Sequence, residues 1–218
     1  MTISRCIMNV GIALAFTHLL SGNAAADESA DTAAPFEFSA QTLADLAECK
    51  APHDVLAEVG GRLFASEAPP AFLKRVDAEG TALGLETFEL DKPVTVFGEP
   101  ATRISFLKEW VVVERPREAV LASIQSLGLK RAPIKVTEQY YRFIDPEAGP
   151  MLGAFAPVGD ALAMMLGLAT DVQKPTTLFI GCSYAMASEA DFLEAANKAD
   201  ALAGQAGDDL KRMILEGK

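Results

Sequence analysis

Residues 93–116, PVTVFGEPATRISFLKEWVVVERP, contain three β-strand patterns separated by two short turns. The predicted strands cover residues 94–97, 102–107 and 110–115. The third strand begins with a run of apolar residues, Trp110 to Val113, which is typical of a strand covered on both faces. We therefore expect a β-sheet in which this third strand is central.

Helical patterns precede this region. Apolar residues recur at helical spacing from Ser39 onward until Pro52 interrupts them, and a second helix then carries Val55 to Leu63. A third, short helix is predicted at residues 70–76. The chain before the strands is therefore expected to be mainly helical.

Further elements follow the three strands. Pro116 suits the first position of a helix that Gly128 ends, and strands are predicted at residues 134–144 and 176–181. Ser188, with Asp191 three residues later, forms an N-cap pattern for a C-terminal helix. An apolar stripe continues along that helix through Phe192, Ala196, Ala199, Leu202, Ala206, Leu210 and Met213.

The order of these elements predicts the fold class. Strands that cluster, rather than alternate strictly with helices, favour an α+β fold. We predict a mostly antiparallel sheet with N-terminal helices, one helix between strands and a C-terminal helix packed on it. A single domain should cover residues 36–218, with a helical part at 36–80, a sheet part at 81–186 and the C-terminal helix at 187–216.

The first 26 residues have the three regions of a secretory signal peptide. Arg5 lies before an apolar stretch, and small residues up to Ala26 offer a cleavage site before Asp27. The apolar stretch is shorter than the roughly 20 residues that a membrane-spanning helix needs. We therefore predict cleavage near Ala26, a location in the periplasm or outside the cell, a mature form that spans no membrane, and a disordered lead-in at 27–35.

The mature chain is strongly acidic. Without Arg5 it has 18 basic and 30 acidic side chains, a net charge of −12. Binding to nucleic acid needs clustered Lys and Arg, so we expect no nucleic-acid partner.

Two cysteines remain after cleavage, Cys49 and Cys182. An even number of cysteines in an exported chain favours a disulfide. The alternatives are two buried free thiols or a cysteine linked to a partner. A Cys49–Cys182 disulfide would tie the N-terminal helices to the last strand.

Sequence motifs for catalysis or metal binding are weak in this chain. Around Cys182, the motif Gly181-x-Ser183-x-Ala185 resembles the nucleophile elbow of α/β hydrolases. The last glycine of that motif is missing, and no histidine follows His53, although this family places its histidine after the serine. Pro52 also separates His53 from Cys49 in any helix, and the ligand spacing of a metal site is absent. We expect no catalytic residue, no metal and no cofactor.

Residues 147–169, EAGPMLGAFAPVGDALAMMLGLA, form an apolar segment between two predicted strands. In one interpretation, residues 161–168 form a helix that packs on the sheet. In the other, the segment is an exposed surface for a protein partner or a lipid. Residues of this segment and of the preceding strand are then candidates for partner binding: Tyr140, Tyr141, Arg142, Met151, Phe155, Met164 and Met165.

These observations favour binding over catalysis. We expect an exported, non-enzymatic protein that recognises another protein of the cell envelope, as an inhibitor or an immunity-type factor. One alternative is a carrier of a small ligand or lipid in a cavity under the sheet. Another is an envelope hydrolase that uses two carboxylates. The 30 acidic side chains supply many chance pairs, so no pair is assigned a catalytic role.

Overall fold

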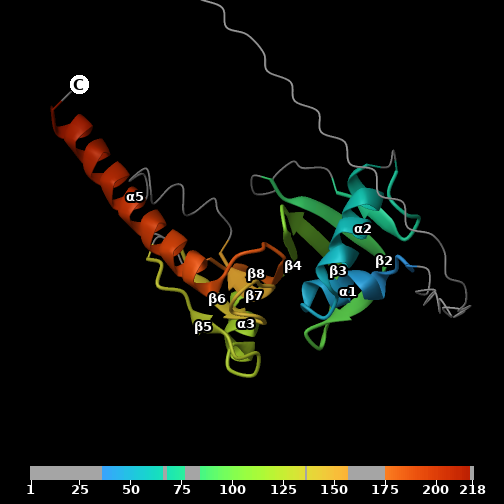
Figure 1. Ribbon diagram of the computed structural model, residues 1–218. Helices are drawn as coiled ribbons and strands as arrows, with labels where there is room; N and C mark the ends of the chain where they lie inside the picture. Colours follow the sequence, from blue (N-terminus) through green and yellow to red (C-terminus); the bar gives the residue numbers. More distant parts are fainter. Residues whose placement is uncertain (1–35, 66–67, 77–83, 136, 157–174, 217–218) are drawn as a thin grey trace, which may run out of the picture. The chain divides into compact units, whose positions relative to one another are not determined.

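The computed structural model describes residues 36–65, 68–76, 84–135, 137–156 and 175–216 (Figure 1). From Glu37 onward the chain belongs to one compact unit. The predicted signal peptide and lead-in lie outside the described residues, and so do the predicted helix at 161–168, Met164 and Met165.

An eight-stranded sheet is the centre of this unit, and every pair of neighbouring strands is antiparallel. The strand order is β1-β2-β3-β4-β8-β7-β6-β5. Together with helices before, between and after the strands, this sheet confirms the predicted α+β class. The strands are β1 (Leu73–Arg75), β2 (Glu86–Val96), β3 (Glu99–Leu107), β4 (Trp110–Pro116), β5 (Lys130–Arg131), β6 (Gln139–Phe143), β7 (Met151–Phe155) and β8 (Thr177–Ser183).

The strand order divides the sheet into two similar halves. In each half, helical structure comes first and four strands then follow one another across the sheet: β1 to β4 after α1 (Ala40–Ala47) and α2 (His53–Phe64), and β5 to β8 after α3 (Arg117–Ser123). The halves join where β4 pairs with β8, from Trp110↔Ser183 to Pro116↔Thr177. β4 is therefore central, as its apolar sequence predicts.

The first face of the sheet is covered by helices. The Ser39 side chain caps α1 by accepting a hydrogen bond from the Thr42 amide, and α1 contacts β2, β4 and β8. Figure 1 shows α1 and α2 beside the strands of the first half. The core under these helices is fully buried and includes Leu43, Leu46, Val59, Leu63, Phe88, Ile104, Val111 and Ile180.

Aromatic side chains gather on the second face. Trp110 packs edge-on against Phe155, with ring centroids 5.0 Å apart, and both border the buried Val112 and Phe179. Further along this face, the C-terminal helix α5 (Glu189–Glu216) places Phe192 4.6 Å from the ring of Tyr141. The sheet therefore has apolar packing on both faces, and α5 joins it at β6.

Three local predictions differ from the structure. Residues 73–75 form strand β1 rather than part of a third helix, because pairing with β2 outweighs the local pattern. The strand predicted at 134–144 begins only at Gln139, since Pro133 cannot donate to a ladder and ends the pairing of β5. Residues 151–155, expected to lie in an apolar segment between two strands, form strand β7 themselves.

Candidate functional site

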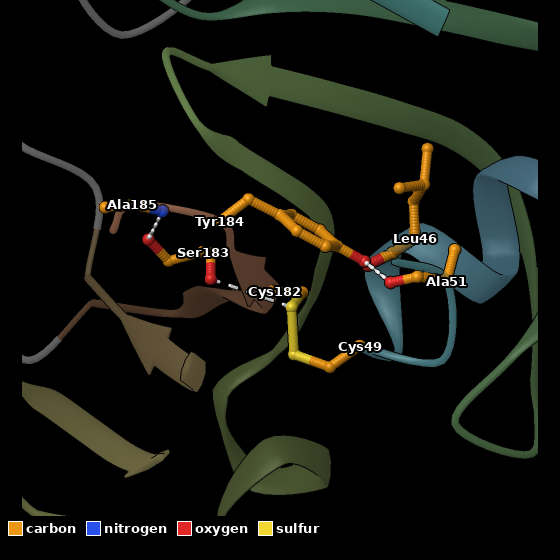
Figure 2. Close-up of a disulfide and its surroundings, with 7 residues drawn as sticks. All are labelled: Leu46, Cys49, Ala51, Cys182, Ser183, Tyr184 and Ala185. Atoms are coloured by element: carbon orange, nitrogen blue, oxygen red, sulfur yellow. Dashed lines mark hydrogen bonds between the residues drawn. A yellow bond between two sulfur atoms is a disulfide. The ribbon is translucent and has the colours of Figure 1, made fainter. Parts of the chain in front are cut away.

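Cys49 and Cys182 form a disulfide, with Cα atoms 5.2 Å apart. Cys49 follows α1 and has a φ of 58°, so the chain turns sharply there before α2 begins. Cys182 lies in β8 and is fully buried. The bond joins the α1–α2 turn to the last strand, as the cysteine count predicts (Figure 2).

Tyr184, the residue after β8, contacts the same turn. Its buried hydroxyl lies 3.1 Å from the carbonyl oxygen of Leu46 and 2.9 Å from that of Ala51, and donates to them (Figure 2). Burial raises the pKa of Tyr184 above its usual value. The phenol and the disulfide therefore act together as structural anchors, and neither sulfur is free to act as a nucleophile.

Ser183 does not have the setting of a catalytic serine. It is the last residue of β8, pairs with Trp110 and Met151, and has only 3% of its surface exposed. Its hydroxyl accepts a hydrogen bond from the Ala185 amide. A nucleophile elbow exposes the serine at a sharp turn between strand and helix, and the buried Ser183 lacks that exposure.

A polar cluster lies where α3 begins and β5 and β6 form the border of the sheet. Arg117 donates to the Glu138 carboxylate from Nε at 2.8 Å and from Nη2 at 2.9 Å. The Tyr140 hydroxyl donates to the same carboxylate at 2.8 Å. Arg131 lies over the Tyr140 ring, with its guanidinium carbon 5.6 Å from the ring centroid. We call Arg117, Glu138, Tyr140 and Arg131 the edge cluster.

These contacts fix the charge of the edge cluster. The hydrogen bonds from Arg117 lower the pKa of Glu138, and burial raises the pKa of Tyr140. Glu138 is therefore an anion and Tyr140 a neutral donor at neutral pH. A carboxylate held in this way is a poor general acid, which weakens the case for hydrolysis at this position.

The predicted partner-binding residues divide between the two faces of the sheet. Tyr141 and Met151 are buried, with 3% and 7% of their surface exposed, so they belong to the core beside α5. Phe155 is half-buried between Trp110 and Phe179. Tyr140 is half-buried on the opposite face, and Arg142 is exposed there.

Tyr140 and Arg142 belong to a larger basic surface. Arg131 pairs with Tyr140 across the strands, and its side chain is 53% exposed. The Arg142 side chain packs over Gly128. Arg131, Lys135 and the three residues between them line an open hollow of about 500 Å³. We call Arg131, Lys135, Tyr140 and Arg142 the edge surface.

Sequence reasoning missed two members of the edge surface, Arg131 and Lys135. Their signal is the spacing of cations in LKRAPIK at 129–135, within a chain that is otherwise acidic. The cation pattern alone does not predict a binding surface, because Arg131 lies beside Tyr140 only through the pairing of β5 with β6.

Within the described part of the chain, no three His, Cys, Asp or Glu side chains are grouped so that they could hold a metal ion. None of the helices described there is both long enough and apolar enough to cross a membrane. Comparisons with protein-family models, curated proteins and solved structures found no match to this chain.

Proposed function

We propose that this protein is exported to the periplasm and binds another protein of the cell envelope through the edge surface. A disulfide-bonded domain is compatible with a location outside the cytoplasm. The observation that carries the proposal is a group of exposed arginine and lysine side chains beside the half-buried Tyr140, on a strongly acidic protein. Arginine and tyrosine are enriched at the energetic centres of protein interfaces.

In more detail, we propose an inhibitory or immunity-type role, in which this protein covers the active site of its partner. The size of the domain and its rigid anchoring by the disulfide and Tyr184 support a preformed binding surface. Such a surface needs no reactive group of its own.

The two alternatives receive less support from the described residues. A hollow beside Val96 and Arg115 has a volume of about 30 Å³, which suits a water molecule rather than a lipid chain. The larger hollow at residues 131–135 is open to solvent, so it does not enclose a lipid chain either. A carboxylate-dependent hydrolase needs one carboxyl group that can give up a proton, and Glu138 does not suit that role because Arg117 holds it as an anion.

Site-specific cross-linking in intact cells tests the proposal. The full chain, with its leader, carries a photoreactive amino acid at Arg142 or, as a control, at Lys92, which is also exposed. We expect one stoichiometric cross-linked envelope protein from position 142 and none from position 92. Recovery of the uncross-linked protein alone, or the same products from both positions, would contradict the proposal.

A further inference from the structure

We propose that the edge surface recognises an acidic segment of its protein partner, in which carboxylate side chains flank an apolar side chain. This inference rests on the proposed function and specifies the chemistry of the partner. It follows from how Arg131 is held, from the hollow beside it, and from the distribution of charge.

Arg131 is held in place without losing its capacity to bind an anion. Its guanidinium stacks on Tyr140, and its Nη1 donates to the Tyr140 hydroxyl at 3.5 Å. The nearest carboxylate oxygen of Glu138 is 3.9 Å from Nη1, and that carboxylate already accepts two hydrogen bonds from Arg117. An arginine has five N–H donors, so the exposed Arg131 retains donors for a carboxylate from outside.

The hollow beside Arg131 provides a place for an apolar side chain. Its lining between Arg131 and Lys135 consists of Ala132, Pro133 and Ile134. The Asp200 carboxylate of α5 accepts hydrogen bonds from the Lys135 amide at 2.8 and 3.0 Å, which holds this loop against α5. A lining that combines apolar residues with two cations suits an apolar side chain that has carboxylates beside it.

Charge at this border differs from that of the remaining chain. Two of the acidic groups here are paired with cations, Glu138 with Arg117 and Glu189 with Lys130, and Asp200 accepts hydrogen bonds from the Lys135 amide. The mature chain has a net charge of −12, so most of its surface repels an acidic segment. A local group of exposed cations on such a surface favours binding of the segment there and in one orientation.

Recognition through side chains fits this border better than addition of a further strand. Among the described strands β5 is the last in the sheet, and it contains only Lys130 and Arg131. Pro133 lacks the N–H group that a longer ladder would need. Short, charged edge strands with a nearby proline are a common protection against strand pairing.

The test uses the mature protein and three short peptides, acetyl-Glu-Leu-Glu-amide, acetyl-Gln-Leu-Gln-amide and acetyl-Lys-Leu-Lys-amide. In NMR titrations we expect the acidic peptide to shift the amide signals of Arg131, Ala132, Ile134 and Lys135, and the other two peptides to leave them unchanged. Arg131→Gln should weaken the binding about fivefold, the effect of one exposed ion pair. The exposed Arg103→Gln serves as the matched control and should bind as the wild type does.

Equal shifts with the neutral peptide, shifts confined to other regions, or no loss of affinity in Arg131→Gln would overturn the inference. These results do not depend on the natural partner. If position 142 cross-links an envelope protein but the acidic peptide does not bind, the proposed function stands and the acidic recognition is wrong. If the peptide binds but no protein is cross-linked, the proposed function fails instead.

Discussion

The Arg117 guanidinium binds the Glu138 carboxylate with two hydrogen bonds, and the main chains of the same two residues hold distant segments. The Arg117 amide donates to the Thr176 carbonyl, and the Glu138 carbonyl accepts from the Ala156 amide, both at 2.9 Å. The ion pair links the first residue of α3 to the residue before β6. The backbone hydrogen bonds attach these two residues to Thr176, which precedes β8, and to Ala156, which follows β7. Through Glu138 and Tyr140, the ion pair also stabilises the position of Arg131 in the edge surface.

Removing this ion pair should destabilise the fold. Arg117→Ala leaves the Glu138 carboxylate, which is 11% exposed, without its main partner. We expect a loss of about 2 kcal/mol in the free energy of unfolding, measured by urea denaturation. Arg103→Ala removes an exposed ion pair to Glu89 and should cost less than about 0.5 kcal/mol. Equal losses in the two variants would show that the Arg117 pair has no special role.

The same pair gives a pH dependence with a definite sign. Because hydrogen bonds from Arg117 lower the pKa of Glu138, its ionised form stabilises the folded state. The contribution is complete above the unfolded pKa of about 4.3 and is lost as the pH falls through the lower folded value. The stability advantage of the wild type over Glu138→Gln should therefore be constant from pH 6 to 8 and decline below about pH 4.3. An advantage that persists unchanged at pH 3 would contradict this assignment.

The disulfide should account for a large part of the stability. It joins residues separated by 133 positions, so it greatly restricts the unfolded chain. We expect Cys49→Ala/Cys182→Ala to lose about 3–5 kcal/mol in the free energy of unfolding. Mass spectrometry after thiol alkylation should find no modified cysteine in unreduced, mature wild-type protein, even in denaturant. A labelled Cys182 under these conditions would rule out the disulfide.

Two glycines offer a matched test of the packing between strands. A Cβ added at Gly181 would lie 2.0 Å from the Val111 carbonyl oxygen and 2.7 Å from the Val112 Cα. Nothing lies within 4 Å of a Cβ added at Gly60 in α2. Gly181→Ala should therefore fail to fold or lose more than about 3 kcal/mol, whereas Gly60→Ala should gain about 0.5–1 kcal/mol. Circular dichroism with urea denaturation measures both, and a stable Gly181→Ala protein would argue against this pairing of β4 and β8.

Local patterns in the sequence were sufficient to predict the α+β class, the central strand β4 and the pairing of the two cysteines. Each depends on information that lies close together in the chain or on a simple count. Strand β1 could not be predicted in this way, because Leu73–Arg75 forms a strand only through its pairing with β2. The same holds for β7, whose apolar residues have no alternating pattern because most of them are buried.

The edge surface was predicted only in part for a related reason. Alternation along β6 places Tyr140 and Arg142 on one face and Tyr141 on the other, so neighbouring residues have different roles. Tyr141 packs against Phe192 of α5, a contact that local sequence does not encode. Arg131 joins Tyr140 only through the register between β5 and β6.

Binding by the edge surface is the central claim, and the affinity of the purified partner from cross-linking tests it most directly. Isothermal titration compares the wild type with Arg131→Glu/Arg142→Glu and with Lys92→Glu/Lys108→Glu, which makes the same change in net charge at exposed positions elsewhere. We predict that the first double variant raises the Kd about tenfold or more, whereas the second leaves it within about twofold. Equal effects of the two variants, or unchanged binding by the first, would contradict the account.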